Sequence, residues 1–270
     1  MIDVDSLAEL VPTDEDTYIK ADGLQYCKRC HTARQSKIEI FGRVRIVPCL
    51  CRCMDEERKK EAEARARAKE IDRLRKMCYS DILLKSQTFE ADDQPEATQS
   101  KAARNYVENF QAMKEKGQGL LMYGNVGTGK TFLAACICNA LVDKRTPCLM
   151  TTFTRLINTI TGMWEGKQEY IDSLAGFDLV AIDDLGTERN TEFTNEYVFS
   201  IVDTLYRAKV PMIITSNLAL GQMVNETDLR QKRVYDRIIE RCTPIEFKGE
   251  SRRITKARAE YKNNKNILGI

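Results

Sequence analysis

From residue 100 onward, short apolar runs alternate with longer stretches in which apolar residues recur every three or four positions. The longer stretches predict helices, and residues 191–209 show one apolar face made by Phe193, Tyr197, Ile201 and Leu205. The short runs predict strands at residues 120–123, 148–152, 178–184, 210–217 and 244–249. Strands that alternate with helices are typical of an α/β fold, in which a parallel sheet lies between helices.

The first hundred residues follow a different pattern. Residues 55–77 are rich in Ala, Glu, Lys and Arg, lack Gly and Pro, and place opposite charges three or four positions apart, which predicts a long charged helix. Residues 86–99 are polar, contain one Pro and show no sustained period. We therefore expect a small module at 1–54, a charged helix and linker at 55–99, and the α/β domain at 100–270.

Composition narrows the class of protein. The chain has 270 residues, of which 43% are hydrophobic, and its net charge of +2 means that any contact with nucleic acid must come from local patches. No stretch of eighteen apolar residues occurs, and the amino terminus is acidic where a secretory signal would be basic. We expect a cytoplasmic protein with no membrane partner.

A glycine-rich loop joins the first predicted strand of the α/β domain to the helix that follows. Its residues fit the pattern G-x-x-x-x-G-K-[ST], in which backbone N–H groups wrap a phosphate, the Lys reaches the outer phosphates and the Thr hydroxyl binds Mg²⁺. The positive end of the following helix points at the same anion. The predicted nucleotide-binding residues are Gly124, Asn125, Val126, Gly127, Thr128, Gly129, Lys130 and Thr131.

Two further predicted strands end in polar residues. Asp183 and Asp184 end the apolar run 178–184, and the carboxyl ends of parallel strands share the sheet edge where the phosphate loop lies. We predict that Asp183 holds Mg²⁺ and that Asp184 orients or deprotonates the attacking water. Asn217 ends the next run and is a candidate sensor of the γ-phosphate. Because Asp184 is shorter than the Glu frequent at such positions, we expect slow turnover.

Residues 228–242 predict a helix with four arginines on one face, at positions 230, 233, 237 and 241. A solvated basic stripe explains Arg230 and Arg233. Arg237 has an alternative interpretation, an arginine finger that neutralises transition-state charge in a neighbouring subunit's nucleotide site.

Five of the ten cysteines lie close together near the amino terminus, as a C-x-x-C pair and a C-x-C-x-C group eighteen residues later. Two such groups at this distance are typical of a tetrahedral Zn²⁺ site, to which each group contributes two thiolates. Free surface cysteines are the alternative. A site of four ligands leaves one of the five candidates spare, and the candidates are Cys27, Cys30, Cys49, Cys51 and Cys53.

The motifs GNVGTGKT, LVAIDDLG, IITSN, VYDRIIERC and FKGESRR, in this order, resemble the AAA+ ATPase core of the DnaC/DnaI-type helicase loaders and their IstB-type relatives. The resemblance covers about residues 100–255. It implies an ATP site in which Asn217 is the first sensor, Arg237 the finger, and Arg253, with Arg252 as a rival, the second sensor. Only seventeen residues follow Arg253, too few for the usual AAA+ helical lid.

The same resemblance implies a replication role. Such a loader uses its amino-terminal module to bind a replicative ring helicase, self-associates through its ATP sites, binds single-stranded DNA and hydrolyses ATP to let the helicase go. DNA contacts are implied for residues 151–164, where Phe153, Arg155 and Trp164 offer stacking and charge. The alternative is that Phe153 and Leu156 belong to the core. The alternatives are an IstB-type transposition helper and a P-loop kinase of a small molecule. The expected cofactors are ATP, Mg²⁺ and Zn²⁺.

Overall fold

The computed structural model describes residues 16–79, 81–187 and 191–269, and the chain divides into two compact units, Met1–Lys69 and Glu70–Ile270. Residues 1–15, which carry most of the acidic amino terminus used above, lie outside the described residues. In the described ranges no helix combines the length and the apolar character needed to cross a membrane.

The first unit contains two antiparallel hairpins and the start of a long helix. β1 (Thr17–Ile19) pairs with β2 (Gln25–Cys27), and β3 (Gln35–Ile40) pairs with β4 (Arg43–Pro48). Phe41 and Gly42 join β3 to β4, and both have positive φ, as a tight two-residue hairpin turn requires. The predicted charged helix is α1, which begins at Arg52 and ends at Cys78.

The second unit is built on a five-stranded sheet in the order β6-β7-β8-β5-β9, in which all neighbouring strands are parallel. The predicted α/β architecture is therefore confirmed. The strands are β5 (Gly119–Gly124), β6 (Cys148–Thr152), β7 (Leu179–Leu185), β8 (Met212–Ser216) and β9 (Cys242–Phe247).

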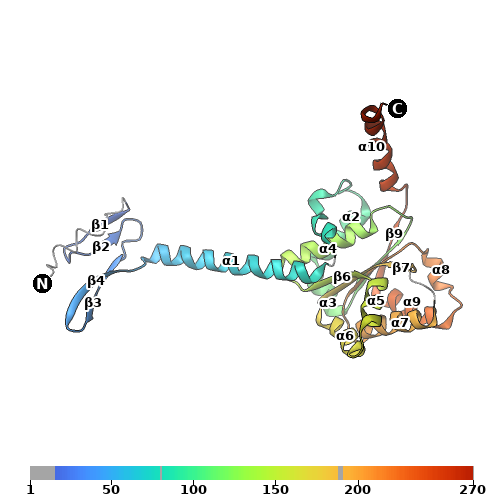
Figure 1. The fold of residues 1–270 in the computed structure, drawn as a ribbon, viewed down its shortest axis with the longest axis horizontal. Helices are drawn as coiled ribbons and strands as arrows, with labels where there is room; N and C mark the ends of the chain where they lie inside the picture. Colours follow the sequence, from blue (N-terminus) through green and yellow to red (C-terminus); the bar gives the residue numbers. More distant parts are fainter. Residues whose placement is uncertain (1–15, 80, 188–190, 270) are drawn as a thin grey trace. The chain divides into compact units, whose positions relative to one another are not determined.

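Helices cover both faces of this sheet (Figure 1), because alternate strand residues point to opposite sides. Met122 packs with residues of α2 and α4, while its neighbour Leu121 packs with residues of α5, α7 and α9 on the other face. The helices of this unit are α2 (Thr98–Glu108), α3 (Phe110–Lys116), α4 (Lys130–Asp143), α5 (Phe153–Gly162), α6 (Lys167–Ser173), α7 (Glu192–Arg207), α8 (Leu220–Val224), α9 (Leu229–Arg241) and α10 (Arg252–Leu268), with short 3₁₀ turns η2 (Ile82–Ser86), η3 (Phe89–Ala91) and η4 (Leu174–Gly176).

The segment expected to be a linker, residues 86–99, lies within the second unit. The Asn139 side chain on α4 donates hydrogen bonds to the carbonyls of Leu84 and Gln87, and Phe89 packs against the core beside α4. These bonds satisfy backbone groups that would otherwise need water, so this polar segment is part of the folded domain. The functional division at residues 54 and 99 stays a prediction.

Candidate nucleotide site and cysteine cluster

The glycine-rich loop lies between the end of β5 at Gly124 and the start of α4 at Lys130. Gly127 and Gly129 have φ values of 78° and 103°, which L side chains rarely adopt. A Cβ at Gly127 would also collide with the Ser251 hydroxyl. Since the loop opens onto the amino-terminal end of α4, it has the geometry of a phosphate site.

The junction of β9 and α10 supports the loop from the other side. Asn125 donates its backbone N–H to the Phe247 carbonyl at 3.0 Å, and Arg252 donates its own to the Gly127 carbonyl at 2.9 Å. The loop conformation is thereby tied to the residues that carry both second-sensor candidates.

The Lys130 side chain folds back along the loop. Its ammonium group donates to the carbonyls of Gly124 and Asn125 at 2.9 and 2.7 Å, and the residue is only 5% exposed. Burial lowers the pKa of Lys130, while the carboxylates of Asp184 and Asp183 oppose that shift. The amine is therefore held beside the loop by these two carbonyls.

Asp183 lies directly opposite the start of α4. The Thr131 hydroxyl is 2.9 and 3.0 Å from the two Asp183 carboxylate oxygens. Burial raises the pKa of Asp183, and the hydrogen bond from Thr215 works in the opposite direction. A hydroxyl and a carboxylate in contact form a donor set that suits Mg²⁺, which prefers oxygen ligands.

A pocket of about 390 Å³ collects most of the predicted residues, and a volume of this order suits a small-molecule ligand. Asn217 and Asp184 line it together with the phosphate loop. Residues that no motif marked also line it, namely Gln87, Ala91, Asp93 and Phe132. The first three belong to the polar segment 86–99, which carries no motif, so only the fold could reveal their place in the pocket.

The two second-sensor candidates have different surroundings. Arg252 donates to the Asp93 carboxylate and to the Gln94 side-chain oxygen, each at 2.8 Å. Arg253 also lines the pocket, and its positive charge contributes to the lowered pKa of Lys130. Both arginines therefore line the pocket, but of the two, in the described part of the chain, only the Arg252 guanidinium is bonded to residues of the segment 86–99.

Arg237 is not among the residues that line this pocket. Its Nε donates to an Asp203 carboxylate oxygen of α7 at 2.9 Å, and its guanidinium lies 4.8 Å from the centre of the Phe199 ring. The side chain remains 25% exposed. Within its own chain, Arg237 is therefore held against α7, away from the phosphate loop.

The residues named for DNA contact are separated by the fold. Phe153 is 1% exposed and belongs to the core, so its interpretation as a stacking residue is wrong: the first residue of α5 points toward the sheet. Trp164 is fully exposed. Arg155 lines a groove with Thr152 and Asn158, and this groove also reaches Thr131 and Asp183.

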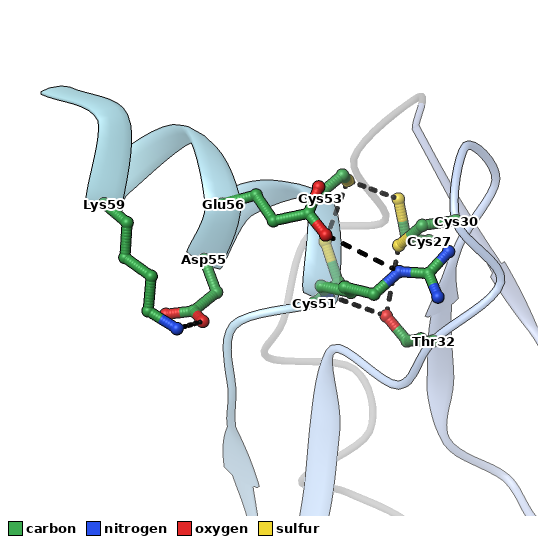
Figure 2. Close-up of polar contacts among 9 residues, drawn as sticks. Cys27, Cys30, Thr32, Cys51, Cys53, Asp55, Glu56 and Lys59 are labelled. Carbon is green, nitrogen blue, oxygen red and sulfur yellow. Dashed lines mark hydrogen bonds and ion pairs between the residues drawn. The ribbon is translucent and has the colours of Figure 1, made fainter.

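Four of the five clustered cysteines come together in the first unit. Figure 2 shows the sulfur atoms of Cys27, Cys30, Cys51 and Cys53 turned toward one another, and all four lie within 4.8 Å of each other. Tetrahedral zinc with Zn–S distances of about 2.3 Å requires sulfurs about 3.8 Å apart. The Cys27–Cys53 and Cys51–Cys53 separations are 3.6 and 3.4 Å.

The fifth cysteine is directed elsewhere. Cys49 is exposed, and its thiol donates to the Ala33 carbonyl at 3.5 Å. The described residues therefore offer one complete four-sulfur donor set, to which Cys49 does not belong.

Comparison with known proteins gives a consistent picture. The family model for the IstB-like ATP binding protein matches residues 53–260. The replicative helicase loader DnaI of Bacillus subtilis is 23% identical over 199 residues, which are 68% of this chain and 64% of that protein. The replicative helicase loader DnaC of Escherichia coli is 29% identical over 140 residues, 50% of this chain and 55% of that protein. The chain thus spans between half and two thirds of these relatives.

A crystal structure of DnaI superposes with a TM-score of 0.54 and 22% identity, and the match covers 63% of this chain and 96% of that chain. At this level of identity the likeness shows the fold. The second unit accordingly has the AAA+ architecture that the motifs predicted.

Proposed function

This chain belongs to the family of IstB-like ATP binding proteins, and on that premise we propose that it is an ATP-dependent loader of a replicative ring helicase onto single-stranded DNA. The main support for the proposal is the combination of a pocket and the relatives of the chain. A pocket lined by a phosphate loop, a strand-end carboxylate and Asn217 occurs in a chain whose curated relatives include DnaI and DnaC, both named replicative helicase loaders.

Each residue at this site then has its own role in ATP binding and hydrolysis. The phosphate loop and Lys130 bind the phosphates, and Thr131 and Asp183 hold Mg²⁺, which neutralises phosphate charge when it is bound. Asp184 orients the attacking water, and Asn217 senses the γ-phosphate. Arg253 acts as the second sensor, since it lines the pocket and the Arg252 guanidinium is bonded to Asp93 and Gln94. The short Asp184 side chain makes turnover slow.

Arg237 supplies the finger from a neighbouring subunit. Arg237 does not line the pocket of its own chain, and its side chain on α9 is 25% exposed. In an assembly the guanidinium would leave Asp203 and contact the γ-phosphate of the nucleotide bound by the adjacent chain. ATP bound at this junction orders the assembly. Single-stranded DNA and self-association stimulate hydrolysis. Hydrolysis then releases the helicase.

The first unit binds the helicase, and Zn²⁺ held by the four clustered cysteines stabilises it. Its β3–β4 hairpin supports this role, because Phe41 at the turn is fully exposed and Ile40 and Val44 beside it are 42% and 58% exposed. Apolar side chains next to Arg43 and Arg45 resemble the composition of protein interfaces, which are enriched in aromatic residues and Arg.

Single-stranded DNA is bound by the second unit along α5. The groove beside Arg155 is lined by Thr152, Asn158 and Thr159, and these side chains offer hydrogen bonds to phosphate oxygens. Trp164, fully exposed in the loop after α5, offers a stacking surface.

A transposition helper of the IstB type is the second candidate, favoured by the name of the matching family. Isolation of the tagged chain from its native cell, in the presence of ATP, distinguishes the two. The loader proposal predicts that a hexameric replicative helicase is recovered, and that recovery falls when Phe41→Asp is introduced but not when the exposed Trp164→Asp is. Recovery of a transposase without helicase contradicts it.

A further inference from the structure

The two carboxylates that end β7 lie in an irregularity of the sheet. β7 and β8 pair in parallel through Ile182 with Ile214 and next through Leu185 with Ser216. Between these pairs, Asp183 and Asp184 together stand opposite Thr215 alone. Such a bulge places two residues against one, leaves ladder hydrogen bonds unmade and redirects side chains.

The Thr215 hydroxyl takes up the bonds that the bulge leaves open. It accepts the Asp184 backbone N–H at 2.9 Å and donates to an Asp183 carboxylate oxygen at 2.6 Å. Thr215 is 1% exposed, so water cannot replace it in either bond. One hydroxyl therefore contacts both acidic residues, the first through its side chain and the second through its backbone.

Asp184 adopts a conformation that needs such support. Its φ of 60° lies in the left-handed region, which costs about 1–3 kcal/mol for a residue other than Gly and persists where the surroundings impose it. The bond from its N–H to Thr215 is one such constraint, and the Thr187 hydroxyl donates to its carbonyl from the other side.

Asp183 is fixed between two hydroxyls. Thr131 contacts it from α4 and Thr215 contacts it from β8. Two residues beyond Thr215 lies Asn217, the sensor candidate, and Ser216 between them bonds to the Leu185 carbonyl at 2.8 Å. The end of β8 is thus attached to both sides of the bulge.

We propose that Thr215 is a positioning residue of the ATPase site, whose hydroxyl sets the Asp183 carboxylate for Mg²⁺ and holds the Asp184 backbone in the conformation that aims its carboxylate at the attacking water. The proposal rests on the proposed ATPase function and adds a residue to it. Thr215 is not among the residues that line the pocket; it acts through the two aspartates.

The test compares Thr215→Val, which keeps the shape and loses the hydroxyl, with Thr215→Ser, which keeps the hydroxyl. Loss of a group that orients a metal ligand typically costs about 10–100-fold. We expect Thr215→Val to lower kcat by about that factor with little change in KM for ATP, and Thr215→Ser to recover most of it. Thermal unfolding verifies that both variants are folded. Should Thr215→Val not fold, Thr215→Cys, whose thiol is a weak donor, takes its place.

A binding measurement separates this proposal from the proposed function. The affinity for a fluorescent ATP analogue is measured with and without Mg²⁺. The Mg²⁺-dependent gain should be reduced in Thr215→Val and retained in Thr215→Ser. An unchanged gain and a kcat within twofold of wild type would overturn the positioning role. A wild-type chain that shows the gain but never hydrolyses ATP would contradict the ATPase function alone, and the binding result would still decide on Thr215.

Discussion

At the scale of single residues, two adjacent arginines at the start of α10 have different surroundings. Both line the pocket, but Arg252 also bonds to Asp93 and Gln94 and so ties the segment before α2 to it. The charge of Arg253 instead contributes to the lowered pKa of Lys130, and we propose that Arg253 is the second sensor and Arg252 a structural residue. Sequence alone left the two as rivals, because a motif of the form G-x-S-x-R fixes a position only as well as its alignment does.

Substitution of each arginine by Ala tests this division. A hydrogen bond to a charged group contributes about 1.5–3 kcal/mol, so Arg253→Ala should reduce ATP affinity or turnover by about 10–100-fold and leave the melting temperature nearly unchanged. Arg252→Ala should lower the melting temperature by about 2–4 °C for each kcal/mol lost, with a smaller effect on turnover. Melting curves and steady-state kinetics of both variants decide, and the opposite assignment of effects would contradict the division.

Other residues show which parts of the site could be located from sequence motifs. The phosphate loop, Asp183 and Asn217 could be located from sequence because their spacing and their positions at strand ends are local properties. Thr215 could not, since its importance arises from a register shift between two strands that are distant in sequence. For Phe153 the sequence left DNA stacking and a core position as alternatives, because the direction of a side chain depends on the fold, and the structure places it in the core.

At the scale of elements, the first unit illustrates a missed signal. Residues 37–46 alternate between polar and apolar side chains on either side of Phe41 and Gly42. This pattern predicts a hairpin, but the region was interpreted from its cysteines and no hairpin was predicted. Both hairpins are small, and β3–β4 is mostly exposed. A segment with so little core needs another source of stability, and metal-binding energy can become folding energy.

This dependence predicts a clear set of outcomes for the cysteines. Protein purified without chelator should contain one zinc ion per chain by elemental analysis. Cys27→Ser and Cys51→Ser should lose the zinc and unfold the β1–β4 region, because a buried thiolate ligand disappears. Cys49→Ser, the matched control, should retain both zinc and fold. Wild-type protein without stoichiometric zinc, or zinc lost from Cys49→Ser alone, would contradict the four-sulfur site.

At the scale of the whole molecule, the sequence pattern predicted all five strands of the second unit, because its buried strands read as continuous apolar runs. Of its helices it predicted α4, α7 and α9, whereas α2, α3, α6, α8 and α10 were not among the predicted elements. The polar segment 86–99 was placed outside the domain because composition does not reveal where backbone carbonyls find donors. Its bonds to Asn139, Arg104 and Arg252 come from three separate helices. The polarity of a segment therefore does not show whether side chains of neighbouring helices bond to its backbone.

ATP hydrolysis at a site shared between neighbouring chains underlies the proposed cycle, and mixed assemblies test it directly. Arg237→Ala removes the finger and leaves the chain's own pocket intact, whereas Lys130→Ala disables the pocket and leaves the finger. Each variant alone should lack ATPase activity on single-stranded DNA, and Arg237→Ala should still bind ATP. Mixed in varying ratios, the two should recover partial activity, because some junctions pair an intact pocket with an intact Arg237. No recovery at any ratio, with co-assembly verified independently, would contradict a site completed by the neighbouring chain.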